Sequence, residues 1–221
     1  LVILISQSGE TADTLAALKL AKEAGIDTLA IVNRKDSSIA REAKEVIYTK
    51  AGIEIAVATT KAYLAQVIVL LLLAIKGNDK KEEYLDSIRV LPNLITKYIN
   101  EYDYSSIAKV IENKEHVFYL GRGIDYYLSM EGSLKLKEIS YIHSEAFQAG
   151  ELKHGSISLI DKDFGVIAVV TDKSISDKTI SNLKEVAARG AKIVAITNIA
   201  DDNFSDYKIL VDDYNELLNP L

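Results

Sequence analysis

The 221-residue chain contains no cysteine, no tryptophan and only two prolines. Without a thiol it can form no disulfide, no cysteine-ligated metal site and no thiol nucleophile, and this composition fits the cytoplasm. Basic residues do not dominate, since 26 Lys and Arg stand against 32 Asp and Glu and give a net charge of −6. Nucleic acid is therefore not expected as a partner. An anionic substrate would need backbone N–H groups or a few local lysines.

Long apolar runs are absent as well. The longest, Val67–Ile75, is far too short to cross a bilayer. It continues a helical pattern that starts at Val57 and includes Lys61 and Gln66. We therefore expect a buried helix at Val57–Ile75 and no membrane partner. The first residues contain neither a basic segment nor a signal cleavage site.

The chain repeats itself. Leu4–Ser6 aligns without a gap on Val169–Thr171, and the same offset places Gly25 on Gly190 and Asn33 on Asn198. Each copy is expected to form a strand, a polar loop, an amphipathic helix ending at glycine, and a second strand. The expected strands are nearly continuous apolar runs: Val2–Ile5, Thr28–Val32, Val166–Val170 and Ile193–Ile196. Such runs indicate an α/β fold with two repeated doubly wound domains, whose parallel sheets are covered by helices on both faces.

The two copies have different surroundings. A further strand at Val117–Leu120, a glycine loop and a long helix precede the second copy, whereas the first copy starts at residue 1. The helix Val57–Ile75 follows the first copy, but nothing equivalent follows the second. We expect two domains at 1–76 and 104–221, each lacking a piece, joined by linker helices at 77–103. The alternative is that the two halves complete one another in a single body.

The first candidate site is Ser6–Thr11, with the sequence Ser-Gln-Ser-Gly-Glu-Thr. It follows a buried strand and opens a helix, where free N–H groups and the helix dipole favour an anion. Gly9 permits close approach of the backbone, and three hydroxyls add donors to a phosphate. An ordinary helix N-cap is the alternative. The second copy lacks the glycine, so we expect one phosphate site.

The second candidate is the helix segment Glu131–Glu138. Spacing places Glu131, Lys135 and Glu138 on one helical face. A carboxylate beside a lysine can move a proton next to a carbonyl while the lysine stabilises the oxyanion. A solvated ion-pair face is the alternative that spacing alone favours.

The third candidate is the polar stretch Ser144–Gly155, which contains His154. A histidine can transfer protons to and from a sugar ring oxygen near neutral pH, although a lone loop histidine is usually only a surface residue. His116 and His143 show no ligand spacing to His154, so we expect no metal and no cofactor. The stretch 56–61, which includes Thr59, is expected to begin a helix and to offer further donors.

Together these motifs resemble the pair of sugar isomerase (SIS) domains of the glucosamine-6-phosphate synthase family. Ser6–Thr11 resembles the SIS phosphate loop, which several sugar-phosphate proteins share. The segments Glu131–His143 and Gly150–Gly155 are more specific to the synthase. That family converts fructose 6-phosphate and ammonia released from glutamine into glucosamine 6-phosphate.

The resemblance implies a role for each matching residue. It implies phosphate contacts at Ser6, Gln7, Ser8 and Thr11, and a sugar contact at Thr59, which stands where the family has serine. It makes Glu138 the base that moves the proton from C1 to C2, assisted by Lys135. It makes His154 the acid/base of ring opening, contributed in the family by the neighbouring subunit of a homodimer.

The resemblance also implies missing parts. The glutaminase domain, the first unit of the first SIS domain and the C-terminal tail with its Schiff-base lysine have no counterpart, so we expect no glutamine-dependent activity from this chain alone. Two other functions stay open. One is another SIS sugar-phosphate isomerase or deglycase. The other is a non-catalytic sugar-phosphate-binding module, which would not need Glu138 and His154.

Overall fold

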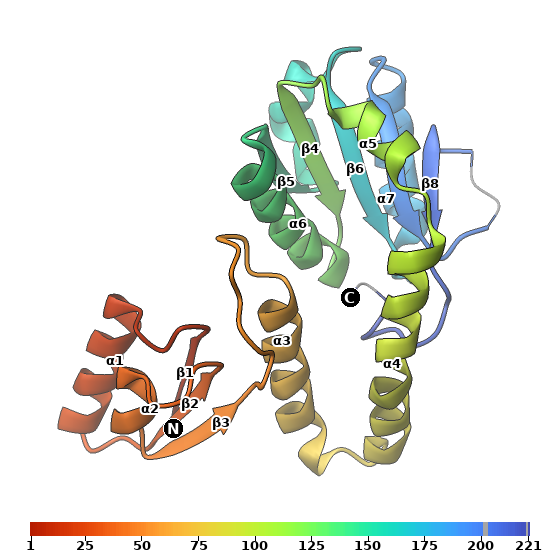
Figure 1. Cartoon of the computed structure of the whole chain (residues 1–221). Coiled ribbons are helices and arrows are strands. Elements are labelled where there is room, and N and C mark those ends of the chain that lie inside the picture. The colour runs from red at the N-terminus through yellow and green to blue at the C-terminus, as the bar shows by residue number, and fades with distance from the viewer. Residues whose placement is uncertain (201–202, 220) are drawn as a thin grey trace. The chain divides into compact units, whose positions relative to one another are not determined.

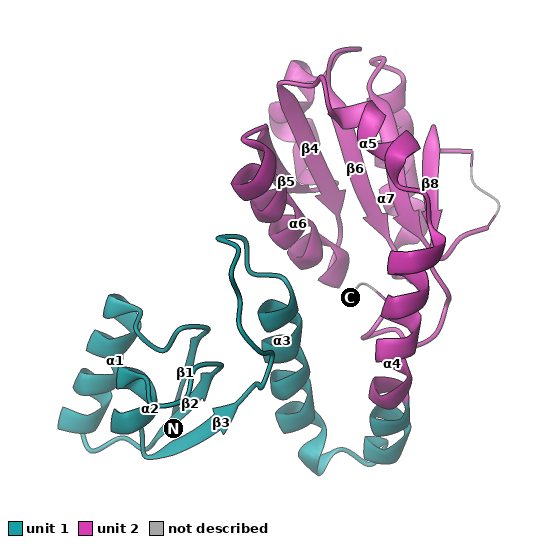
Figure 2. Cartoon of the chain, in the orientation of Figure 1, with its two compact units in different colours: residues 1–86 teal, residues 87–221 magenta. Residues whose placement is uncertain are grey.

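The computed structural model describes residues 1–200, 203–219 and 221. It divides into two compact units, Leu1–Asp86 and Ser87–Leu221 (Figure 2). The division falls within helix α4 (Lys81–Glu101), which accounts for most of the predicted linker. Each unit contains its own parallel sheet and its own helices (Figure 1).

Unit 1 is built on a three-stranded parallel sheet in the order β1-β2-β3. The strands are β1 (Val2–Ser6), β2 (Thr28–Val32) and β3 (Glu45–Tyr48). Helices α1 (Ala12–Glu23) and α2 (Ser38–Glu42) connect them, and α3 (Lys61–Ala74) with the short helix η1 (Ile75–Gly77) follows. The core forms where Leu4, Ala30 and Val32 of the sheet meet Leu18 and Ile39 of the helices.

Unit 2 has a five-stranded parallel sheet in the order β5-β4-β6-β7-β8. Its strands are β4 (His116–Gly121), β5 (His143–Gln148), β6 (Gly165–Val170), β7 (Lys192–Thr197) and β8 (Tyr207–Leu210). Its helices after α4 are α5 (Ser105–Ile111), α6 (Ile124–Ser140), α7 (Ser176–Ala187) and the short η2 (Glu151–His154) and η3 (Ser156–Leu159).

The repeat is present in three dimensions. The order β1-α1-β2-β3 of unit 1 corresponds to β6-α7-β7-β8 of unit 2, and both sets of strands pair in parallel. Gly25 (φ +68°) and Gly190 (φ +96°) each follow the helix in a left-handed conformation that suits glycine. The predicted α/β fold class with two repeated domains is confirmed.

Three details of the sequence-based prediction are wrong. All six residues of β6 are buried, but Ile3 and Ile5 of β1 are exposed, because they point to the face of β1 opposite the buried Leu4 and Ser6, and that face is not covered by the described residues. The predicted helix at Val57–Ile75 begins only at Lys61, and among the residues of α3 only Ala62 is buried. The stretch Ser144–Gly155 is not all loop, since β5 covers its first part.

Helix α3 contains most of the longest apolar run of the chain, Val67–Ile75. Among the described residues, no helix combines the length and the apolar character that crossing a membrane requires.

Candidate functional site

The loop Ser6–Thr11 connects the carboxyl end of β1 to α1, as the sequence predicts. Gly9 has φ +67°, and a Cβ atom there would lie 2.0 Å from Ser37 Oγ. Only glycine therefore fits this position without moving the start of α2. The backbone N–H of Ile39 donates to the carbonyl of Gly9 at 3.0 Å, which ties the loop to that helix.

The hydroxyls of this loop are partly used to shape it. Ser6 Oγ lies 2.8 Å from Thr11 Oγ1 and accepts a hydrogen bond from the Gly9 N–H at 3.0 Å. Ser8 Oγ accepts from the Glu10 N–H at 3.2 Å. Thr11 is the N-cap residue of α1, but no side chain among the described residues caps this helix. The first N–H groups of α1 are therefore free to bind an anion.

Glu10 fixes the loop from its other side. Its carboxylate accepts the backbone N–H of Ser38 at 2.9 Å. This hydrogen bond, with smaller contributions from the charges of Arg41 and Arg34, holds the pKa of Glu10 below its usual range. The carboxylate is thus engaged by α2, and it does not cap α1.

A hollow of about 630 Å³ lies beside the loop. Gln7 and Ser8 line it, together with the basic side chains of Arg34, Lys35 and Lys50. These cations sit just beyond the carboxyl ends of β2 and β3, the sheet edge where open α/β sheets bind ligands. No sequence motif predicted these three residues. Their only signal was their position directly after strands, and β3 itself was not predicted.

Asn33, which the repeat singled out, organises the rim of this hollow. Its Oδ1 accepts hydrogen bonds from Thr49 Oγ1 at 3.1 Å and from the Ala51 N–H at 2.8 Å. Its Nδ2 donates to the carbonyl of Gly52 at 2.7 Å. The segment after β3 is therefore held against the end of β2.

In unit 2, Lys135 lies between two carboxylates on one face of α6. Its Nζ is 2.7 Å from Glu138 Oε2 and 3.3 Å from Glu131 Oε1, and all three side chains are largely shielded from solvent. Burial alone would lower the pKa of Lys135. The hydrogen bonds and charges of Glu138 and Glu131 outweigh it and raise that pKa. The lysine therefore stays protonated near neutral pH, which suits a group that stabilises an oxyanion.

The remaining candidate residues stand apart from these clusters. His154 ends η2 and is exposed, and within the described part of the chain its side chain has no hydrogen bond or ion pair. Thr59 is half-buried and precedes the N-cap residue of α3 by one position. The structure thus groups the other predicted residues into one loop of unit 1 and one helix face of unit 2.

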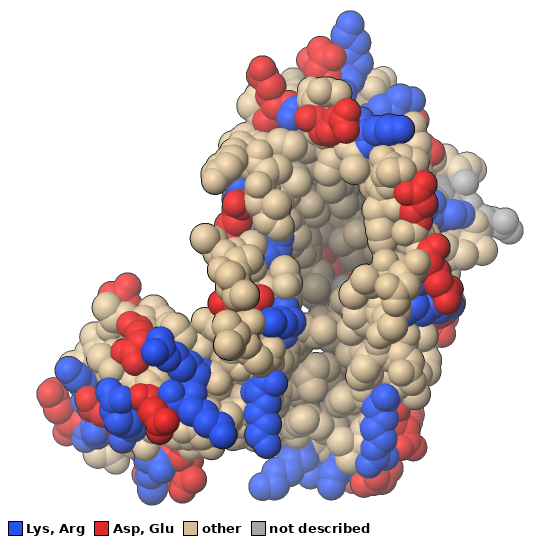
Figure 3. Space-filling view, in the orientation of Figure 1, with Lys and Arg blue, Asp and Glu red and all other residues tan. Residues whose placement is uncertain are grey.

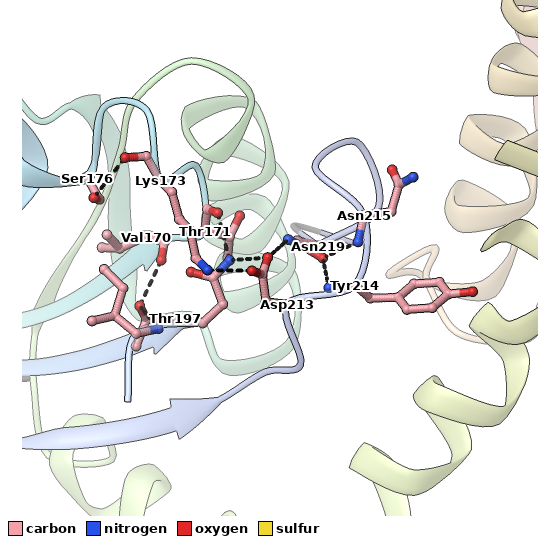
Figure 4. Close-up of polar contacts among 11 residues, drawn as sticks. Val170, Thr171, Lys173, Ser176, Thr197, Asp213, Tyr214, Asn215 and Asn219 are labelled. Carbon is pink, nitrogen blue, oxygen red and sulfur yellow. Dashed lines mark hydrogen bonds and ion pairs between the residues drawn. The ribbon is translucent and has the colours of Figure 1, made fainter. Parts of the chain in front are cut away.

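The corresponding loop of unit 2, Thr171–Ser176, is closed by the protein itself. The buried carboxylate of Asp125 accepts the backbone N–H groups of Thr171 at 2.8 Å and of Asp172 at 3.2 Å, and the Thr171 hydroxyl at 2.6 Å. Lys173 forms an ion pair with Asp213, which also accepts hydrogen bonds from Asn198 and Asn219 (Figure 4). The Asp125 carboxylate therefore occupies the backbone N–H groups at the two positions that correspond to Ser6 and Gln7 of unit 1.

Charge does not single out a further anion site. Lys and Arg side chains are interspersed with Asp and Glu over the face of unit 1 that Figure 3 shows. The distinguishing features are local: a glycine-containing loop at the carboxyl end of a parallel strand and a basic hollow beside it. They are typical of the class of doubly wound α/β proteins that bind ligands at this edge of the sheet.

The comparisons with known proteins agree with this class. The SIS domain family matches residues 1–76 and 110–215, so the chain belongs to the SIS family. It is 48% identical over 237 aligned positions to a protein of Fusobacterium nucleatum called glutamine–fructose-6-phosphate aminotransferase [isomerizing]. It is 47% identical to the protein of the same name from Caldanaerobacter subterraneus. The whole chain aligns in both cases, but it spans only 38% of their length.

Solved structures give the same fold. The C-terminal domain of glucosamine-fructose-6-phosphate aminotransferase from Francisella tularensis superposes with a TM-score of 0.90 at 36% identity, covering 99% of this chain and 66% of that one. Glucosamine-6-phosphate deaminase from Thermotoga maritima superposes with a TM-score of 0.75 at 24% identity, covering 99% and 66%. The second match bears on the fold alone.

Proposed function

We propose that this chain is the sugar-isomerase part of an enzyme that makes glucosamine 6-phosphate from fructose 6-phosphate and glutamine-derived ammonia. The observation that carries the proposal is the loop Ser6–Thr11, with its glycine turn and the free N–H groups of α1 beside a basic hollow. The names of the relatives support the choice of substrate.

In this proposal the loop binds the substrate phosphate. Ser6, Gln7, Ser8 and Thr11 contribute hydroxyl, amide and backbone donors, and the dipole of α1 adds a favourable field. The cations of the hollow supply further positive potential. Thr59 contacts the sugar through its hydroxyl.

The proton transfer is assigned to unit 2. Glu138 takes the proton from C1 of the open-chain sugar imine and returns it at C2. Lys135, held protonated between its two carboxylates, stabilises the charge that develops on the sugar oxygen. His154 opens the ring by moving a proton to the ring oxygen and from the hydroxyl. Its exposure in a single copy is compatible with a neighbouring subunit using it in a homodimer.

The whole activity needs more than this chain. Ammonia would come from a glutaminase domain of the full-length protein, which we propose works in the cytoplasm as a homodimer. The chain itself has no cysteine, so it cannot release ammonia from glutamine by a thiol mechanism. Another SIS isomerase or deglycase would use the same loop, and a non-catalytic sugar-phosphate sensor would not need Glu138.

Product formation separates these functions. The purified chain is given fructose 6-phosphate with either glutamine or concentrated ammonia, and glucosamine 6-phosphate is measured. We expect no product with glutamine and background rates at best with ammonia. In the full-length protein, glutamine should give product. If the full-length protein interconverts sugar phosphates but incorporates no nitrogen, another SIS isomerase is the correct function.

A further inference from the structure

A pair of histidines lies in unit 2 outside the residues assigned so far. His116 begins β4 and His143 begins β5, and the parallel register of these neighbouring strands places the two residues directly opposite each other. Their Nδ1 atoms are 3.1 Å apart, and both side chains are exposed. Because 27 positions separate them in the chain, their spacing gave no hint of a pair.

The two rings are held in a defined arrangement. His116 stacks on Phe164, with ring centroids 5.3 Å apart and an interplanar angle of 20°. The His143 ring stands nearly perpendicular to that of His116, at 83°. Phe164 in turn packs against Phe118 of β4, which anchors this arrangement to the core of the sheet. The strand register and the aromatic contacts therefore limit how far the Nδ1 atoms can separate.

The distance suits a shared metal ion. Two nitrogen ligands at about 2.0–2.1 Å from a metal lie about 2.9 Å apart at a right angle and about 3.4 Å apart at a tetrahedral angle. The observed 3.1 Å falls between these values. The Nδ1 contact is the only hydrogen bond of either ring within the described residues, so a metal would displace one hydrogen bond.

We propose that His116 and His143 form a two-histidine clamp for a divalent transition metal, with water completing the coordination. Imidazole nitrogen is a good ligand for Cu²⁺, Ni²⁺ and Zn²⁺, and Cu²⁺ is bound most tightly in this series. No group of three or more His, Asp or Glu that could hold a metal occurs among the described residues, so the clamp has two protein ligands and exchanges its metal readily. The expectation of no metal site considered only the spacing of His116 and His143 to His154.

The test is a titration of the chain, produced without a polyhistidine tag, with Cu²⁺. Calorimetry measures the affinity, and electron paramagnetic resonance identifies the ligand atoms. We expect one site with nitrogen ligands. His116→Gln and His143→Gln should each weaken the site by at least about tenfold, because each removes one of its two protein ligands and even the loss of a group that only orients a ligand costs about 10- to 100-fold. The double variant measures the background from the N-terminal amine. His154→Gln, which changes the third and last histidine, should leave the site intact.

Both substituted side chains are exposed, so the variants are expected to fold, and circular dichroism verifies this. Equal Cu²⁺ binding by the wild type and the double variant would overturn the proposal. So would a loss of binding that His154→Gln alone produces.

Discussion

In both copies of the repeat a loop follows the first strand, but among the described residues only the loop of unit 2 binds a carboxylate of the protein itself. In unit 1, the loop after β1 turns at Gly9 and adjoins a hollow lined by Arg34, Lys35 and Lys50. In unit 2, the loop after β6 is already filled by the Asp125 carboxylate, and its lysine is paired with Asp213. The same backbone plan therefore gives one loop suited to an external ligand and one loop used to stabilise the fold.

The difference follows from a few residues. Gly9 turns the first loop with a positive φ, whereas Ser174 occupies the corresponding position and donates to Asp172. The second loop also has α6 beside it, which brings Asp125 into reach from its first turn. The sheet of unit 1 has no strand and helix equivalent to β4 and α6 among the described residues. A duplicated unit can thus lose a ligand site when a neighbouring helix supplies the anion.

The largest expected effect is on the rate of isomerisation, which we assign to unit 2, and not on the affinity for the sugar phosphate, which we assign to unit 1. In the full-length protein, Glu138→Gln should lower isomerisation of the sugar phosphate by about 10²- to 10⁴-fold, because the amide cannot accept the proton. Binding of glucosamine 6-phosphate, measured by calorimetry, should change little. Glu131→Gln is the matched control, since it alters the other carboxylate on Lys135. Equal losses in the two variants would remove Glu138 from the role of base.

The turn at Gly9 is the next most sensitive position. Gly9→Ala should destabilise unit 1 by about 3 kcal/mol or more, because the added Cβ collides with Ser37 Oγ and the backbone keeps a positive φ. Gly25→Ala is the control with nearly the same φ but no atom within 4 Å, and it should cost only about 1 kcal/mol. Urea denaturation measures both. Similar losses would mean that the loop tolerates a side chain.

A substitution of Asp125 tests whether its carboxylate stabilises the loop Thr171–Ser176 of unit 2. Asp125→Ala leaves the N–H groups of Thr171 and Asp172 without their acceptor, and each buried unsatisfied donor costs about 1–3 kcal/mol. We expect unit 2 to lose about 3 kcal/mol of unfolding free energy. Asp13→Ala changes the exposed acidic residue in the first turn of α1 and should cost less than about 1 kcal/mol. A small effect at Asp125 would indicate that water replaces its carboxylate.

The sequence predicted those parts of the molecule whose cause is local. Short, nearly continuous apolar runs identified β1, β2, β4, β6 and β7, and the motif Ser6–Thr11 identified the loop that follows β1. The strands β3, β5 and β8 were missed. All three are only partly buried and lie at sheet edges, and β3 and β8 have only four residues each, so their conformation depends on pairing with a neighbour.

Contacts between distant segments were equally hidden. Asp125 and Thr171 are 46 positions apart in the sequence. Periodicity relates residues within one helix or strand, so it could not predict a contact between the start of α6 and the loop after β6. The cations Arg34, Lys35 and Lys50 become neighbours of the phosphate loop only when β1, β2 and β3 pair in register. The face shared by Glu131, Lys135 and Glu138 was predictable because helical spacing fixes it.

Hydroxyl deletions distinguish the two loops by ligand binding. Ser8→Ala or Thr11→Ala should each weaken the binding of glucosamine 6-phosphate by about 10- to 100-fold, because a hydrogen bond to a charged group contributes about 1.5–3 kcal/mol. Ser176→Ala, at the position in the second loop that corresponds to Thr11, should leave binding unchanged. Calorimetry gives the affinities. If Ser176→Ala weakens binding as much as Thr11→Ala does, the second loop also holds the ligand.

The smallest effect concerns the ion pair that closes the second loop. The hydrogen bond from Lys173, with support from Asn219 and Asn198, lowers the pKa of Asp213 below its unfolded value. A lowered folded pKa means that the charged carboxylate adds stability above the unfolded pKa, and that this contribution is lost as the pH falls through the folded pKa. Both side chains of the pair are about half exposed, so solvent screening limits the gain to less than about 1 kcal/mol.

Asp213→Asn should therefore lower the unfolding free energy of unit 2 slightly at neutral pH, and the difference from wild type should shrink as the pH drops below about 4. Urea denaturation at several pH values measures this difference. A difference that stays constant down to about pH 2 would show that the substitution destabilises unit 2 through lost packing or hydrogen bonds and not through the lost charge.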